Sequence, residues 1–105
     1  MSERPLREAE LLAVFARREE ILAQLREILI EKLNVRRVPE EIDPDTPLFG
    51  TGLRLDSVDA VELWVNVRQR FNLKVPEDER RLTALRTLNA LASLILEEEA
   101  THAGA

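Results

Sequence analysis

One serine stands where this sequence can best support covalent chemistry. Ser57 follows Asp56, a residue type that caps helices, and comes after the Gly-x-Gly segment at positions 50–52. Asp59, three residues after Asp56, nearly completes a capping box. A helix N-terminus offers free N–H groups and a positive dipole end, which favour a phosphodiester on this hydroxyl. Because the segment holds no histidine or lysine to act as a base, we interpret Ser57 as a substrate of another enzyme.

The composition excludes several classes of function. The chain has no cysteine, so disulfides, thiolate metal sites and a cysteine nucleophile are ruled out. The single histidine, His102, lies in the C-terminal tail with no partner for acid–base work, and we expect it to be solvent-exposed and no metal to be bound. A net charge of -5 argues against binding to nucleic acid. No apolar run approaches the ~20 residues of a membrane span, so a cytoplasmic location is our default expectation.

The first third of the chain has the apolar spacing of a helix. From Glu8 to Leu33 apolar residues recur three or four apart, which predicts one long helix. A polar stretch at positions 17–20 interrupts the pattern, so Pro5–Ala16 could instead be a separate amphipathic segment before a helix that starts at about Glu19. The sequence leaves both alternatives open. The expected inward residues are Leu11, Phe15, Leu22, Leu25, Leu29 and Leu33.

The next segment, Asn34–Asp56, contains three prolines and two glycines and predicts a long ordered loop. Loops of this length need anchoring or a function. The apolar residues expected to anchor it are Val38, Ile42, Leu48, Phe49, Leu53 and Leu55.

Further helices are predicted after the loop. A second helix runs from Ser57 to about Phe71, a short third helix spans Glu77–Leu85, and Thr87 caps a last helix. The chain is then a single all-α domain, a four-helix bundle over residues 19–99, with an amphipathic extension at 1–18 and a flexible tail at 100–105. The residues assigned to the inward face of the second helix are Val61, Trp64, Val67 and Phe71.

The segment Gly52–Leu63, GLRLDSVDAVEL, resembles the attachment motif of acyl carrier proteins and related phosphopantetheine-binding domains. The similarity extends upstream through PDTPLF and downstream through RFNLKVP and RTLNALASLI, so it covers roughly Glu20–Glu98. A bare Asp-Ser pair is a weak signal, whereas this pair with its correctly spaced neighbours is specific. The resemblance implies the fold of that family, with a long loop between the first two helices and a short third helix.

The resemblance also implies a cofactor and a set of partners. Ser57 would receive 4′-phosphopantetheine from coenzyme A through a separate phosphopantetheinyl transferase, and the thiol of the arm would hold acyl groups as thioesters. Asp56 would cap the helix and help to present the serine. The chain would not be an enzyme, and we expect a monomer that serves acyl-loading ligases or transferases and ketosynthase-type enzymes in fatty-acid-like, polyketide-like or specialised lipid biosynthesis.

Two features depart from the family pattern at the expected docking surface. Arg68 and Arg70 offset the acidic residues of the second helix, and Arg54 occupies a loop position where the family often has a small residue. We therefore expect dedicated partner enzymes with mixed-charge docking sites. The residues expected to contact partners are Val58, Asp59, Glu62, Val65, Arg68 and Arg54.

Two other functions remain open at this stage. An aminoacyl or peptidyl carrier shares the arm and is loaded by an adenylating enzyme. An unmodified helical adaptor would use an exposed helix face to hold a partner. Modification of Ser57 separates the adaptor from both carriers, and loading assays separate the carriers from each other.

Overall fold

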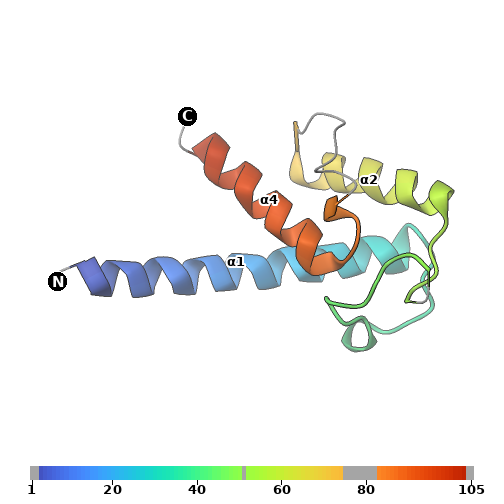
Figure 1. Ribbon diagram of the computed structural model, residues 1–105, viewed down its shortest axis with the longest axis horizontal. Helices are drawn as coiled ribbons and strands as arrows, with labels where there is room; N and C mark the ends of the chain where they lie inside the picture. Colours follow the sequence, from blue (N-terminus) through green and yellow to red (C-terminus); the bar gives the residue numbers. More distant parts are fainter. Residues whose placement is uncertain (1–2, 51, 75–82, 104–105) are drawn as a thin grey trace.

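A computed structural model describes the backbone of residues 3–50, 52–74 and 83–103, and the side chains of these ranges except 3–7 and 102–103. Three α-helices fill most of these ranges: α1 at Glu3–Glu31, α2 at Ser57–Phe71 and α4 at Leu88–Ala103 (Figure 1). A 3-10 turn, η1, spans Pro39–Glu41. No β-strand occurs in the described ranges, where Phe49 and Leu55 form only an isolated bridge. The all-α prediction is confirmed.

The expected third helix falls largely outside the described residues. Of the predicted Glu77–Leu85 helix, residues 77–82 lie outside the described ranges, and Thr83 and Ala84 are helical in the remaining part. The described part of the chain therefore confirms a helical fold and leaves the expected count of four helices as a prediction.

The N-terminal segment is a continuous part of α1, so the alternative of a separate helix is wrong. The helix stays regular through positions 17–20 and stops before Asn34, whose φ of 58° is left-handed. At ~1.5 Å per residue, its 29 residues span about 43 Å, most of the 49 Å length of the molecule. Because the buried face begins only at Ile21, the expected inward residues Leu11 and Phe15 are 57% and 63% exposed.

The long loop is held to α1 and to the segment before α4 by hydrogen bonds. Arg26 Nε donates to the carbonyl of Ile42 at 3.0 Å, and Leu48 N donates to the carbonyl of Arg86 at 2.9 Å. Ile42, Leu48 and Leu55 are buried as expected, whereas Val38 is 53% exposed and is not an anchor. The loop is thus an ordered support for the start of α2.

The core lies where α2 and α4 pack on the C-terminal half of α1. Thr87 Oγ1 accepts a hydrogen bond from Ala90 N at 3.1 Å, which confirms the predicted cap of α4. This helix continues to Ala103, so residues 100–103 of the expected flexible tail are helical. The largest fully buried side chains are Ile21, Leu25, Ile28, Leu29, Ile42, Leu48, Leu63, Val67, Leu88, Leu91 and Ile95.

The inward face of α2 differs from the expected one. Trp64 and Val67 are buried as predicted and Phe71 is half-buried, but Val61 is 63% exposed and Leu63 takes its place in the core. Steps of three residues fall short of a full helical turn by about 60°, so Val61, Trp64 and Val67 cannot all share one face.

Candidate functional site

Ser57 is the first residue of α2 and is exposed to solvent. Among the described residues, none forms a hydrogen bond with its hydroxyl. The backbone N–H groups of Ser57 and Val58, at the first two helical positions, also donate to no described residue. The structure therefore presents an open hydroxyl beside two free N–H donors, a suitable setting for a phosphate group.

Asp56 and Asp59 fix the first turn of α2 through a reciprocal pair of hydrogen bonds. Asp59 N donates to Asp56 Oδ1 at 2.9 Å, and Asp56 N donates to Asp59 Oδ2 at 3.0 Å. Ala60 N adds a bond of 3.0 Å to the carbonyl of Asp56. The predicted cap and capping box are confirmed, so Asp59, which is half-buried, has the structural role expected from its spacing and is also one of the predicted docking residues.

The loop before the serine requires unusual backbone positions. A Cβ on Gly52 would lie 1.8 Å from the carbonyl oxygen of Pro47, so only glycine fits. Leu53 N donates to that same carbonyl at 3.0 Å, and Leu55 N donates to the carbonyl of Leu48 at 3.0 Å. These bonds fold the loop back on itself and set where α2 starts.

Arg54 holds a left-handed conformation within this loop, with a φ of 58°. Few residues other than glycine adopt it without strain. Its side chain is exposed, and its role as a partner contact stays a prediction.

A pocket of about 400 Å³ adjoins the serine, and its wall is almost entirely apolar. It is formed where the loop, the first turn of α2 and the segment before α4 meet. The lining residues are Phe49, Leu55, Asp56, Ser57, Ala60, Leu85 and Arg86. The pocket was not predicted from the sequence, because its walls combine residues 49–60 with Leu85 and Arg86, which are distant in the chain. A group attached to Ser57 would have an apolar space directly beside it.

The outer face of α2 carries a row of three exposed valines, which we call the valine row: Val58, Val61 and Val65. Their spacing of three and four places them on one side of the helix. Glu62 is exposed beside them. Val58 and Val65, which we predict to contact partners, are exposed on this face, and Val61, which was assigned to the inward face, is exposed beside them.

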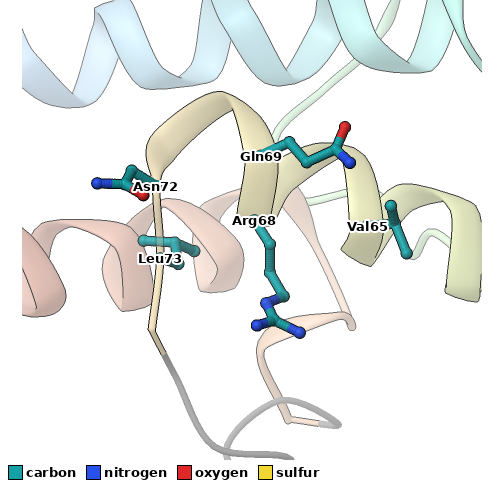
Figure 2. Close-up of a pocket in the computed structure, with 5 residues that line it drawn as sticks. All are labelled: Val65, Arg68, Gln69, Asn72 and Leu73. Atoms are coloured by element: carbon teal, nitrogen blue, oxygen red, sulfur yellow. The ribbon is translucent and has the colours of Figure 1, made fainter.

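Arg68 lies at the far end of this face. A pocket of about 370 Å³ is lined there by Val65, Arg68, Gln69, Asn72 and Leu73. Figure 2 shows the Arg68 guanidinium extended away from the helix, one turn beyond Val65. Arg68 forms no ion pair with any described residue, whereas Arg70 lies 3.8 Å from Glu27 of α1. Arg68 is therefore a basic group on this face that no described carboxylate neutralises.

The described groups with a shifted pKa are Arg17 of α1 and Glu99 of α4, and neither belongs to the segment around Ser57. A side-chain hydrogen bond from Arg17 lowers the pKa of Glu99, and the same contact raises the pKa of Arg17. Within the described ranges no group of three metal-ligating side chains occurs. No described helix is both long and apolar enough to cross a bilayer.

Comparisons with known proteins agree with this geometry. A family model described as a phosphopantetheine attachment site matches residues 23–95. The meromycolate extension acyl carrier protein of Mycolicibacterium smegmatis is 35% identical over 92 residues, which are 86% of this chain and 88% of that protein. The acyl carrier protein of Wolinella succinogenes is 36% identical over 59 residues, which are 56% of this chain and 74% of that protein.

A larger protein also contains a similar segment. A non-reducing polyketide synthase of Aspergillus fumigatus is 42% identical over 84 residues, which are 80% of this chain and 4% of the synthase. No solved structure matches the chain significantly. The family match and the identities show that this chain belongs to the acyl carrier proteins, which bear covalent 4′-phosphopantetheine and are carriers, not enzymes.

Proposed function

We propose that this protein carries acyl intermediates as thioesters on a 4′-phosphopantetheine arm attached to the hydroxyl of Ser57. One observation carries the proposal: the exposed first residue of α2 lines an apolar pocket of about 400 Å³. When attached, the arm supplies the thiol for thioester chemistry, which a chain without cysteine does not provide.

The residues around Ser57 have distinct roles in this proposal. Asp56 holds the first turn of α2 in a fixed conformation, so the hydroxyl is presented at a defined position. The free N–H groups of Ser57 and Val58 face the negative charge of a phosphate on that oxygen. Because no described side chain forms a hydrogen bond with the Ser57 hydroxyl, the base that removes its proton belongs to the transferase.

The pocket supports a cargo with an apolar segment. Phe49, Leu55, Ala60 and Leu85 contribute carbon-rich walls beside the attachment residue. A hydrocarbon chain entering this space would lose contact with water, which is favourable by ~25 cal/mol per Å² of buried apolar area. Two relatives are named for meromycolate extension and for polyketide synthesis. We propose a long aliphatic or polyketide-type acyl cargo.

The outer face of α2 supports docking to partner enzymes. The valine row provides the apolar centre, Asp59 and Glu62 lie near Ser57, and Arg68 lies at the opposite end. Arg54 adds a positive charge at the loop beside the first turn. A partner that fits this pattern presents basic groups opposite Asp59 and Glu62 and acidic groups opposite Arg54 and Arg68.

Intact mass is the direct test of attachment. The protein is incubated with coenzyme A, Mg²⁺ and a phosphopantetheinyl transferase of broad specificity. Wild type and Ser93→Ala are expected to gain one phosphopantetheine group, whereas Ser57→Ala gains none. Ser93 is a matched control because it is a helical serine, on α4, whose hydroxyl already accepts a hydrogen bond from Arg18 at 2.9 Å. A gain on Ser57→Ala, or none on wild type, would refute the proposal.

Turnover by partner enzymes tests docking. Arg68→Glu is expected to lower kcat/KM with a dedicated synthase, while Arg37→Glu, in the loop after α1, leaves it unchanged. Efficient turnover by housekeeping fatty-acid enzymes that is insensitive to Arg68→Glu would contradict the mixed-charge docking site.

A further inference from the structure

The N-terminal half of α1 carries an apolar surface that no other described part of the chain covers. Leu11 and Phe15 are 57% and 63% exposed, and Leu12 and Val14 beside them are also exposed. Contiguous exposed apolar residues of this kind mark a surface that another molecule contacts. Tertiary contacts supply most helix stability in proteins, so this half of α1 is expected to gain stability from such a contact.

These residues continue the register of the buried part of the helix. Leu22, Leu25 and Leu29 pack in the core, and stepping back from them by four and three residues in turn reaches positions 18, 15, 11 and 8. This is the repeat of a coiled-coil seam, in which alternating steps of three and four keep residues on one side of a helix. Positions 8, 11, 15 and 18, which we call the free seam, extend it beyond the core.

α4 does not extend its apolar face over the free seam. Its inward face becomes charged at Glu98 and Glu99, and Glu99 pairs with Arg17 of α1. α4 rises away from α1 toward its own C-terminal end (Figure 1). The space next to Leu11 and Phe15 is therefore open to a helix from another molecule.

We propose that a second copy of this chain covers the free seam, with the two N-terminal halves of α1 packed antiparallel about a two-fold axis level with Ala13. Leu11 and Phe15 are each two residues from Ala13, so each pairs with the other across the axis. Glu8 and Arg18 are each five residues away and pair in the same manner. The interface then has two central apolar layers, each a Leu11–Phe15 pair, and two outer layers, each a Glu8–Arg18 pair. It is self-complementary, as a two-fold interface must be.

The charges select the antiparallel arrangement and a second copy as the occupant. Arg18 donates to Ser93 Oγ at 2.9 Å and to the carbonyl and side-chain oxygens of Asn89, all neutral groups, and no described carboxylate pairs with it. Glu8 likewise has no partner among the described residues. Antiparallel pairing brings these two charges together. A parallel pair would place glutamate against glutamate and arginine against arginine, which is unfavourable.

The dimer keeps both carrier sites open. The first turn of α2 lies at the opposite end of the molecule from the N-terminus of α1 (Figure 1), so the two copies of this turn, which starts at Ser57, lie toward the outer ends of the assembly. The proposal goes beyond the carrier function and replaces the monomer expected from the sequence.

Light scattering after size exclusion tests the proposal with the full chain. The wild-type mass is expected to rise with concentration from 12.0 kDa toward twice that value. The double variant Leu11→Glu/Phe15→Glu is expected to stay at 12.0 kDa. Ala13 is exposed on the other side of α1, so Ala13→Glu is the matched control and should behave as wild type. Circular dichroism and modification of Ser57 report whether each variant is folded. A wild type that stays monomeric throughout, or a folded seam variant that dimerises equally, overturns the proposal.

Charge exchange and cross-linking test the orientation. Glu8→Arg weakens dimerisation, and Glu8→Arg/Arg18→Glu restores it. Because the chain has no cysteine, Leu11→Cys and Phe15→Cys can be used as single reporters. An antiparallel pair forms a disulfide when the two variants are mixed, not within either alone. Cross-linking of Leu11→Cys with itself would instead show a parallel pair and overturn the arrangement.

Discussion

Asp56 and Ser57 are neighbours with separable roles, and replacing each in turn tests the account of the site. Asp56→Ala removes the acceptor of the 2.9 Å bond from Asp59 N, while the bond from Asp56 N to Asp59 Oδ2 remains. Loss of one such N-cap costs about 1 kcal/mol. For a domain of this size, that lowers Tm by roughly 4 to 8 °C.

Ser57→Ala is expected to leave stability unchanged and to abolish modification. Ser57 is exposed and forms no hydrogen bond with a described residue, so its replacement changes the unfolding free energy by less than about 0.5 kcal/mol. The variant keeps its Tm and loses all modification by the transferase. Asp56→Asn is the matched control for the cap, because asparagine caps about as well as aspartate while carrying no charge. Any slower modification of Asp56→Asn at unchanged Tm reports the role of the charge in presenting the serine.

Thermal unfolding followed by circular dichroism and intact-mass analysis of the same four proteins provides both readouts. If Ser57→Ala lost as much Tm as Asp56→Ala, the hydroxyl would be a structural group and the cap assignment would be wrong. If Asp56→Asn were as unstable as Asp56→Ala, the observed hydrogen bond would not be the source of the stability.

Three further predictions concern the surrounding structure. Leu29→Ala, at a fully buried position, should lower the unfolding free energy by roughly 2 to 5 kcal/mol in urea titrations. Gly52→Ala places a Cβ 1.8 Å from the carbonyl oxygen of Pro47, so it should destabilise the loop by roughly 1 to 3 kcal/mol and slow modification in the intact-mass assay. Arg17 lowers the pKa of Glu99 below its usual 4.5, so wild type should be more stable than Glu99→Gln, with the full difference above pH 4.5. The difference should disappear as the pH falls through the folded-state pKa of Glu99, which measurements of Tm against pH would show. An equal difference in Tm at every pH would contradict this prediction.

The start of α2 could be predicted because its signals are local. Asp56 and Asp59 lie three residues apart, and their reciprocal bonds need nothing else from the chain. The cap of α4 by Thr87 is of the same kind. The pocket beside Ser57 could not be predicted, because it depends on how residues 49–60 meet Leu85 and Arg86, which are distant in the chain.

The continuity of α1 could not be decided for a similar reason. Its polar stretch resembles a break in the apolar pattern, yet Arg17 pairs with Glu99 and Arg18 contacts Ser93, residues 82 and 75 positions away. These arginines are partners of α4, which a local pattern does not reveal. The left-handed Arg54 is likewise a consequence of the folded loop, because arginine has no intrinsic preference for that conformation.

The misassignment of Val61 shows how α2 combines two tasks. Leu63, Trp64 and Val67 hold the helix to the core, so the valine row is not needed for burial. An apolar row left in water is a liability unless another protein contacts it. The valine row starts next to Ser57 and ends near Arg68. A partner bound along this row therefore has one end beside the Ser57 hydroxyl. Three valines and a few charges offer a small contact area, which gives the weak, rapidly released binding that a protein moving between enzymes requires.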